Sequence, residues 1–202
     1  MVNLEPVKGY PFYIGLLHYP VYNKNGEIIA SAITNLDIHD LARCAETYGA
    51  KRVYIINPLE DQQRLINRIC RHWTEGFGAD YNKDRKEAMS LISIASTIEE
   101  AILEIEEDEG ETPILMATDA GRNKGKSISY KLARQIVASD RKVMILFGTA
   151  WGISKELIEK SDYILEPILG VSDYNHLSVR TASAIILDRL FSQFTMFREI
   201  DM

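Results

Sequence analysis

Six short apolar runs alternate along the chain with longer segments of helical periodicity, and this alternation constrains the fold most strongly. Continuous apolar strands between amphipathic helices indicate an α/β fold: a mostly parallel sheet flanked by helices on both faces. We predict strands at 12–17, 52–56, 91–95, 114–118, 143–147 and 163–165. Helices are predicted at 34–48, 60–73, from 98 onward, and at 129–138, 155–160 and 175–194. At 202 residues the chain fits one domain, 1–202.

The first predicted helix has recognisable start and stop signals. Thr34 and Asp37 have the spacing of a capping box, with Asp in the place of Glu. Apolar residues recur at helical spacing from Ile38 to Ala45, and Gly49 supplies a stop.

The net charge of −6 argues against a nucleic-acid-binding chain until its distribution is considered. Eight acids and no bases lie between Glu99 and Glu111, so the remainder of the chain carries a formal charge of +2. Such a run is usually one solvated helix face. The overall charge therefore conceals a mildly basic remainder.

Several classes of site and location are not indicated. Cys44 and Cys70 show neither metal spacing nor a disulfide framework, and we predict buried or half-buried thiols. The four histidines lack ligand spacing, so no metal is expected. Without a membrane-spanning run or a signal-peptide pattern, we expect a cytoplasmic protein with no membrane association.

Ligands of parallel sheets bind outside the carboxyl ends of the strands, which selects the loops after residues 56, 118, 147 and 165. The loop 148–152 places two glycines around a tight turn, although an ordinary strand-to-helix turn would look the same. The loop 166–178 is long and partly apolar, as in segments that pack around a ligand. The alternative interpretation of this loop is a helix cap at Asp173 or Asn175 with a buried Leu177.

Two basic segments could contact nucleic acid. Four bases and no acid lie from Arg122 to Lys131, which suits phosphate contact, or else a solvated loop. A second stripe could clamp nucleotides by charge and stacking, or form a solvated helix face with its aromatics in the core or in a dimer interface. That stripe consists of Arg64, Arg68, Arg71, His72, Trp73, Phe77 and Tyr81.

Three segments together resemble the SPOUT, or α/β-knot, methyltransferases. They are residues 35–56, which open the domain, 146–153 (LFGTAWGI) and 166–180 (EPILGVSDYNHLSVR). The resemblance covers nearly the whole chain. It is closest to a bacterial group of S-adenosylmethionine (SAM)-dependent RNA methyltransferases, sometimes fused to a tRNA (guanine-N1) methyltransferase.

The resemblance implies a C-terminal trefoil knot and a homodimer in which the partner completes each active site. It implies that SAM is the cofactor and that three loops hold it, mainly through backbone groups. The implied cofactor-binding residues are Thr118, Asp119, Ala120, Gly148, Thr149, Ala150, Gly152, Glu166, Ile168, Gly170, Leu177 and Ser178.

The implied activity is methyl transfer to tRNA or rRNA, and four residues are candidates for it. We assign Arg43 to the RNA phosphate or to activation of the nucleophile, and Asp37 or His176 to proton acceptance. Asn175 could orient the target base.

Each of these roles has a plainer alternative. Arg43 could pair with Asp40 or Glu46 on its own helix, His176 could be a capping or core histidine, and Asp37 could serve its capping box alone. A non-catalytic SAM- or RNA-binding accessory module is the alternative function. It is favoured by Thr149-Ala150, where related enzymes carry a Glu.

Overall fold

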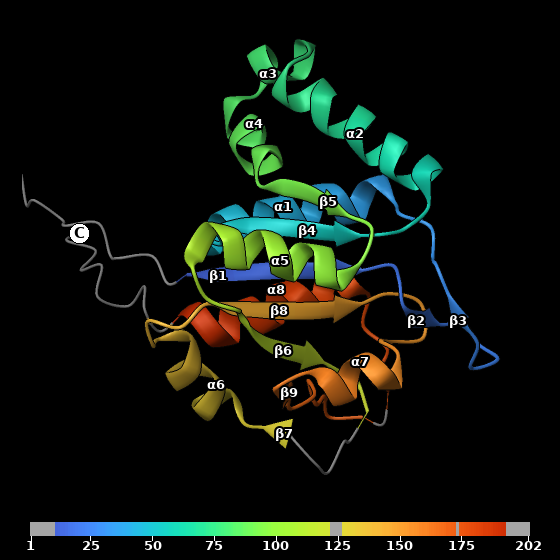
Figure 1. Ribbon diagram of the computed structural model, residues 1–202, viewed down its shortest axis with the longest axis vertical. Coiled ribbons are helices and arrows are strands. Elements are labelled where there is room, and N and C mark those ends of the chain that lie inside the picture. Colours follow the sequence, from blue (N-terminus) through green and yellow to red (C-terminus); the bar gives the residue numbers. More distant parts are fainter. Residues whose placement is uncertain (1–10, 122–126, 173, 193–202) are drawn as a thin grey trace, which may run out of the picture.

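The computed structural model describes residues 11–121, 127–172 and 174–192. It contains a seven-stranded sheet in the order β5-β4-β1-β8-β6-β9-β7, with parallel pairing throughout (Figure 1). The strands are β1 (Phe12–Leu17), β4 (Arg52–Ile56), β5 (Ile92–Ala95), β6 (Ile114–Thr118), β7 (Ser127–Ile128), β8 (Val143–Gly148) and β9 (Tyr163–Leu165). The predicted α/β class and mostly parallel sheet are confirmed.

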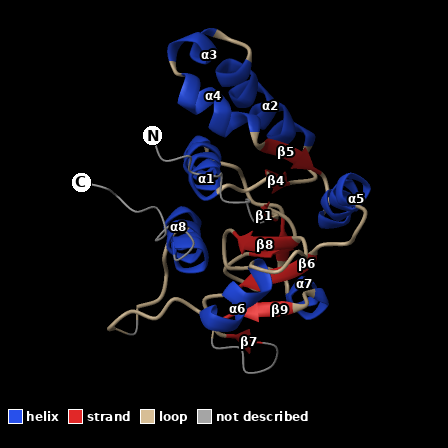
Figure 2. Ribbon diagram, turned by 90° about the vertical axis from the view of Figure 1, so that its left-hand side faces the viewer, coloured by secondary structure: helices blue, strands red, loops and turns tan. Residues whose placement is uncertain are grey.

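Helices cover both faces of this sheet (Figure 2). One face carries α1, α6 and α8, the other carries α5 and α7, and α2 to α4 extend beyond the edge strand β5. The helices are α1 (Asn35–Tyr48), α2 (Glu60–Thr74), α3 (Phe77–Tyr81), α4 (Lys83–Ser90), α5 (Ile98–Glu109), α6 (Tyr130–Val137), α7 (Lys155–Lys160) and α8 (Val179–Phe191).

The central strand β1 shows why its sequence is apolar at every position. Phe12, Ile14 and Leu16 belong to the core cluster beneath α1 and α8, whereas Tyr13 and Leu17 belong to the cluster beneath α5 and α7. All five are at least 97% buried. A strand with helices on both faces must be apolar on both, which explains the continuous run.

The structure adds short elements that periodicity does not predict. These are β7, α3, α4 and an antiparallel hairpin of β2 (Val21–Tyr22) and β3 (Ile28–Ile29). The strands and α3 contain too few residues to show a period, and the eight residues of α4 are mostly polar. The last helix was predicted from Asn175 but begins at Val179, because the Ser178 side chain accepts a hydrogen bond from the Thr181 amide and caps it.

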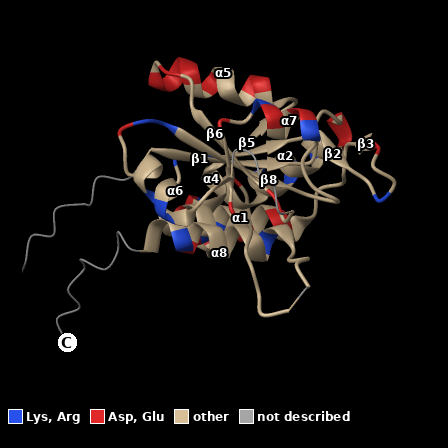
Figure 3. Ribbon diagram, turned by 90° about the horizontal axis from the view of Figure 1, so that it is seen from below, with Lys and Arg blue, Asp and Glu red and all other residues tan. Residues whose placement is uncertain are grey.

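The acidic helix α5 is attached to the sheet at both its apolar and its charged sides. Ile98, Ala101 and Ile105 are buried, and acidic residues make up much of the rest of the helix (Figure 3). Its last residue, Glu109, accepts hydrogen bonds from Lys51 and Tyr13, which lower the pKa of the Glu109 carboxyl to about 2. The predicted solvated face is therefore partly an ion-paired face.

The two thiols are free and half-buried, as predicted. Burial raises the pKa of the Cys70 thiol to about 11. Within the described ranges, no group of three or more His, Cys, Asp or Glu side chains is placed to hold a metal ion. None of the described helices has the length and apolarity needed to cross a bilayer.

Candidate functional site

The three loops predicted to hold the cofactor begin at adjacent strand ends. β8, β6 and β9 are consecutive in the sheet, so their carboxyl ends span about 10 Å. The Thr118 hydroxyl donates to the carbonyl of Leu146 at 2.8 Å, and the Asn175 side-chain amide donates to the carbonyl of Ala120 at 2.7 Å. The structure therefore brings the segments after β6 and β9 into direct contact.

The turn 148–152 is held against the end of β1 and against β2. The Thr149 hydroxyl donates to the carbonyl of Leu17 at 2.9 Å, and Tyr22 exchanges backbone hydrogen bonds with Trp151 and Gly152. Ala150 has a φ of 52° and Gly152 a φ of 103°, so the backbone turns through the left-handed region twice. The turn is compact and specifically shaped.

Gly148 is required by packing within this turn. A Cβ there would lie 2.6 Å from Cγ1 of Ile153 and 2.9 Å from the Ile153 backbone nitrogen. The plainer alternative, a tight strand-to-helix turn, therefore accounts for this glycine by itself. Gly170 differs, because no atom outside its chain neighbours lies within 4 Å of its Cβ position.

The loop 166–178 is anchored at its start and exposed further along. The Glu166 carboxylate accepts from the Tyr130 amide at 2.8 Å, and Ile168 packs against the main core cluster. Leu169 is 60% exposed and Leu177 43% exposed, so Leu177 is not the buried residue of the capping alternative. Ser178 lies at the N-cap of α8, and Asp173 lies outside the described residues.

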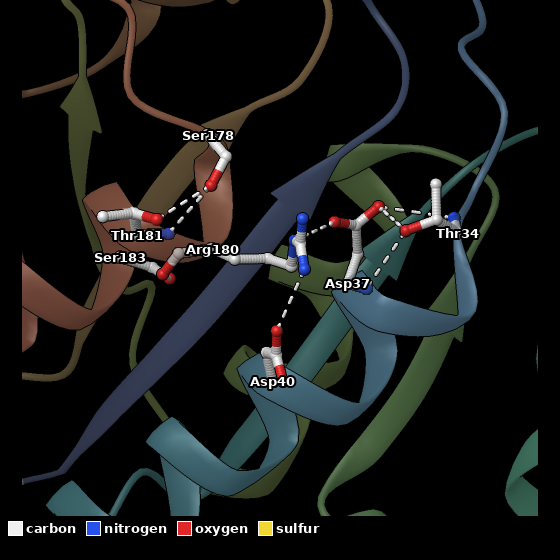
Figure 4. A network of polar contacts seen from close by, with 7 residues as sticks. All are labelled: Thr34, Asp37, Asp40, Ser178, Arg180, Thr181 and Ser183. Carbon is white, nitrogen blue, oxygen red and sulfur yellow. Dashed lines mark hydrogen bonds and ion pairs between the residues drawn. The ribbon is translucent and has the colours of Figure 1, made fainter.

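Both carboxylate oxygens of Asp37 have partners (Figure 4). One accepts from the Thr34 hydroxyl at 2.6 Å and from the Thr34 amide, which completes the predicted capping box. The other lies 3.3 Å from Nε of Arg180, whose Nη1 is 3.1 Å from Asp40. Asp37 thus joins α1 to α8. Sequence spacing could not reveal this pairing between two helices.

Arg43 and His176 are exposed, and neither adopts its plainer alternative. Within the described chain Arg43 forms no ion pair, since Asp40 is bound to Arg180 instead. His176 lies before the Ser178 cap, outside the core, with its ring edge-on to Tyr174 at a centroid distance of 5.5 Å. Both side chains are accessible to a substrate.

Two further predictions concern Asp119 and the basic segment that follows it. Asp119 accepts a hydrogen bond from the Gly121 amide at 3.0 Å. Most of the basic segment predicted to contact phosphate, residues 122–126, lies outside the described residues.

His18, at the carboxyl end of β1, is linked through Ser31 to the turn 148–152, a connection that sequence reasoning missed. It is 1% exposed, and its Nδ1 lies 2.9 Å from the Ser31 hydroxyl, which lies 2.7 Å from the Thr149 hydroxyl. Because the Thr149 proton is used on the carbonyl of Leu17, Ser31 donates to Thr149 and His18 Nδ1–H donates to Ser31. Nε2 is left as an acceptor without a partner among the described residues.

The burial of His18 predicts an acid-dependent loss of stability. Burial lowers the pKa of His18 from 6.5 to about 4, despite the opposing charge of Asp37. As pH falls below 6.5, the unfolded state therefore binds a proton at His18 that the folded state does not. The free energy of unfolding that neutral His18 contributes is fully present above pH 6.5 and is lost as pH falls through 4. The contribution is on the order of 3 kcal/mol.

Urea unfolding at pH 7.5 and pH 4.5 measures this effect. The free energy of unfolding of the wild type should fall more between the two pH values than that of His18→Asn. Equal falls in both proteins would show that His18 is not buried in its neutral form.

Comparison with known proteins agrees with this geometry. Residues 11–192 match the sequence profile of a family described as SAM-dependent RNA methyltransferase. The chain belongs to this family. The predicted enzyme class and cofactor are those of the family, and the non-catalytic alternative is not favoured.

Two relatives show how far the similarity extends. A protein of Oleidesulfovibrio alaskensis named tRNA (guanine-N(1)-)-methyltransferase is 46% identical over 182 residues, which are 90% of this chain and 42% of that protein. A functionally uncharacterized Aquifex aeolicus protein is 44% identical over 90% of this chain and 88% of its own length. The chain therefore spans less than half of the relative whose name states an activity.

Solved structures support the fold. The SpoU methyltransferase AviRb of Streptomyces viridochromogenes, solved in complex with AdoMet, matches with a TM-score of 0.59 at 16% identity. The match covers 96% of this chain and 61% of that one. The resemblance to SPOUT methyltransferases is thus confirmed at the level of fold.

Proposed function

We propose that this chain binds SAM in the loops after β6, β8 and β9 and transfers its methyl group to tRNA or rRNA. The Asn175–Ala120 hydrogen bond carries the proposal, because it joins two of these loops at the carboxyl edge of the sheet. Leu169 and Leu177, on the segment that contains Asn175, are exposed and offer apolar surface against which an adenine can pack.

The residues of the chain have positioning roles in this reaction. When bound, SAM supplies an electrophilic methyl carbon, so the protein must orient the RNA nucleophile and accept its proton. Arg43, which is exposed and has no ion-pair partner in the described part of the chain, binds the RNA phosphate or the nucleophile, and Asn175 orients the target base. Ala120 already accepts one Asn175 proton, which leaves the amide oxygen of Asn175 for the base.

His176 is the better of the two candidate proton acceptors. It is exposed on the loop that follows β9, next to Asn175. Asp37 has both oxygens occupied by Thr34 and Arg180, so accepting a substrate proton would disrupt the junction of α1 and α8. We therefore assign Asp37 to positioning.

The proposal includes a single-domain, cytoplasmic homodimer with a C-terminal trefoil knot. The exposed apolar side chains of Leu169, Val171, Tyr174 and Leu177, between β9 and α8, support the dimer, because a partner would cover them. The Asn175–Ala120 contact supports the knot, because it places the segment before α8 against the segment after β6. Light scattering of the purified chain tests the dimer, which a monomeric mass would exclude.

A two-part experiment tests the proposed function. Calorimetry should detect SAM binding to the purified chain. Incubation with methyl-labelled SAM and total RNA from cells lacking the protein should then label RNA, and mass spectrometry of the digested RNA should identify the methylated nucleoside. SAM binding without any label transfer would contradict catalysis by the chain alone, and absence of binding would contradict the site.

A further inference from the structure

The short helix α3 exposes its large aromatic residues and buries its small ones. Gly78 and Ala79 are buried, whereas the side chains of Phe77 and Tyr81 are each 76% exposed. Burial of apolar area favours the opposite arrangement, so an exposed aromatic pair is informative. The two rings stack on each other, with centroids 5.9 Å apart and planes at 22°.

Packing against Trp73 fixes this orientation. A Cβ on Gly78 would lie 2.6 Å from Cε3 of Trp73, so the α3 backbone lies directly on the indole. The Arg85 guanidinium covers the indole ring at 4.5 Å from its centroid, and the His39 ring meets it edge-on. Only a glycine face fits against Trp73, and the aromatic face of α3 is therefore held outward.

A hollow along α2 is lined as far as Gly76, the residue before Phe77 of α3. It has a volume of about 690 Å³, and its lining carries three arginines against one acid. Arg68 forms no ion pair within the described ranges. The pairs of Arg64 and Arg71 with acids of their own helix are more than 60% exposed, so a phosphate can replace those acids. The lining includes Arg64, Arg68, Arg71, His72 and Glu75.

We propose that α2 and α3 bind a single-stranded segment of RNA, with phosphate in the basic hollow and an unpaired base stacked on Phe77 and Tyr81. Arginines beside exposed aromatic rings are the combination that single strands require.

This surface lies apart from the site of chemistry. α2 to α4 extend beyond β5, at one end of the sheet, whereas β6 and β9 lie toward the other end (Figure 1). The RNA bound there is a part of the substrate distant from the methylated nucleotide. The inference rests on the proposed function for its partner, and it predicts an effect on RNA affinity without an effect on SAM affinity.

The test compares the full chain with the double variant Phe77→Ser/Tyr81→Ser. Probes are a fluorescent 12-nucleotide oligouridylate and a 12-base-pair RNA duplex, with binding followed by anisotropy. The wild type should bind the single strand more tightly than the duplex. The affinity of the double variant for the single strand should fall by on the order of 10-fold for each base that no longer stacks. Arg68→Ala should weaken binding of both probes and reduce the salt dependence.

Leu103→Ser is the matched control, because Leu103 is 56% exposed on the acidic helix α5 and should leave RNA binding unchanged. Photocrosslinking of wild-type protein to 4-thiouridine-containing RNA provides a test that does not depend on variant folding. Crosslinks at residues 77 and 81 support the proposal, and crosslinks confined to other segments overturn it.

The outcomes separate this inference from the proposed function. Methyl transfer by the wild type, together with unchanged RNA affinity of the double variant, overturns the inference alone. Wild-type protein that binds SAM but no RNA overturns both. If light scattering shows a changed molecular mass for the double variant while its RNA affinity is unchanged, the surface is a protein–protein contact. That result also overturns the inference.

Discussion

Replacing Arg43 with alanine is expected to lower kcat/KM for methyl transfer to RNA by on the order of 100-fold, while the Kd for SAM stays unchanged. Arg43 is exposed on α1 and has no ion-pair partner among the described residues, so its charge is available to the substrate. Its loss removes a contact to phosphate or nucleophile without disturbing the loops after β6, β8 and β9. Single-turnover transfer and calorimetry measure the two quantities.

Arg141→Ala is the matched control for Arg43→Ala. Arg141 is also exposed, but it pairs with Glu111 before β8, at the amino edge of the sheet. This variant should transfer methyl groups at the wild-type rate. Unchanged turnover in Arg43→Ala would remove Arg43 from the mechanism, and a parallel loss of SAM affinity would place it in cofactor binding instead.

Gly148→Ala should destabilise the fold by about 1–3 kcal/mol and weaken SAM binding by about tenfold or more. The new Cβ would meet both the side chain and the backbone nitrogen of Ile153, at 2.6 and 2.9 Å. A backbone atom cannot rotate away, so the turn 148–152 must shift from its hydrogen bonds to Leu17 and Tyr22. Urea unfolding and calorimetry check the two effects.

The stability control is Gly170→Ala, whose new Cβ would have no atom of the described residues within 4 Å apart from its own chain neighbours. Its free energy of unfolding should lie within about 0.5 kcal/mol of the wild type. Wild-type stability and SAM affinity in Gly148→Ala would show that the turn tolerates a side chain and is not a fixed element of the site.

The candidate site could be predicted from sequence only where the signal was local. The carboxyl-edge rule selected the loops after β4, β6, β8 and β9, the family resemblance narrowed these to the last three, and Asn175 and Ala120 bring two of them together. It did not find His18 or the engagement of Asp37 by Arg180, because these depend on partners far apart in the chain. Ser31 and Thr149, for example, are 118 positions apart.

The sequence by itself determined the α/β class, the two-sided core and the capped start of α1. These features follow from apolar periodicity and from hydrogen bonds within one turn of chain, which neighbouring residues specify. Only the tertiary structure decided the placement of β8 between β1 and β6, the acceptor left on His18 and the outward orientation of Phe77 and Tyr81. Each of these arises from packing between distant segments, which no local pattern records.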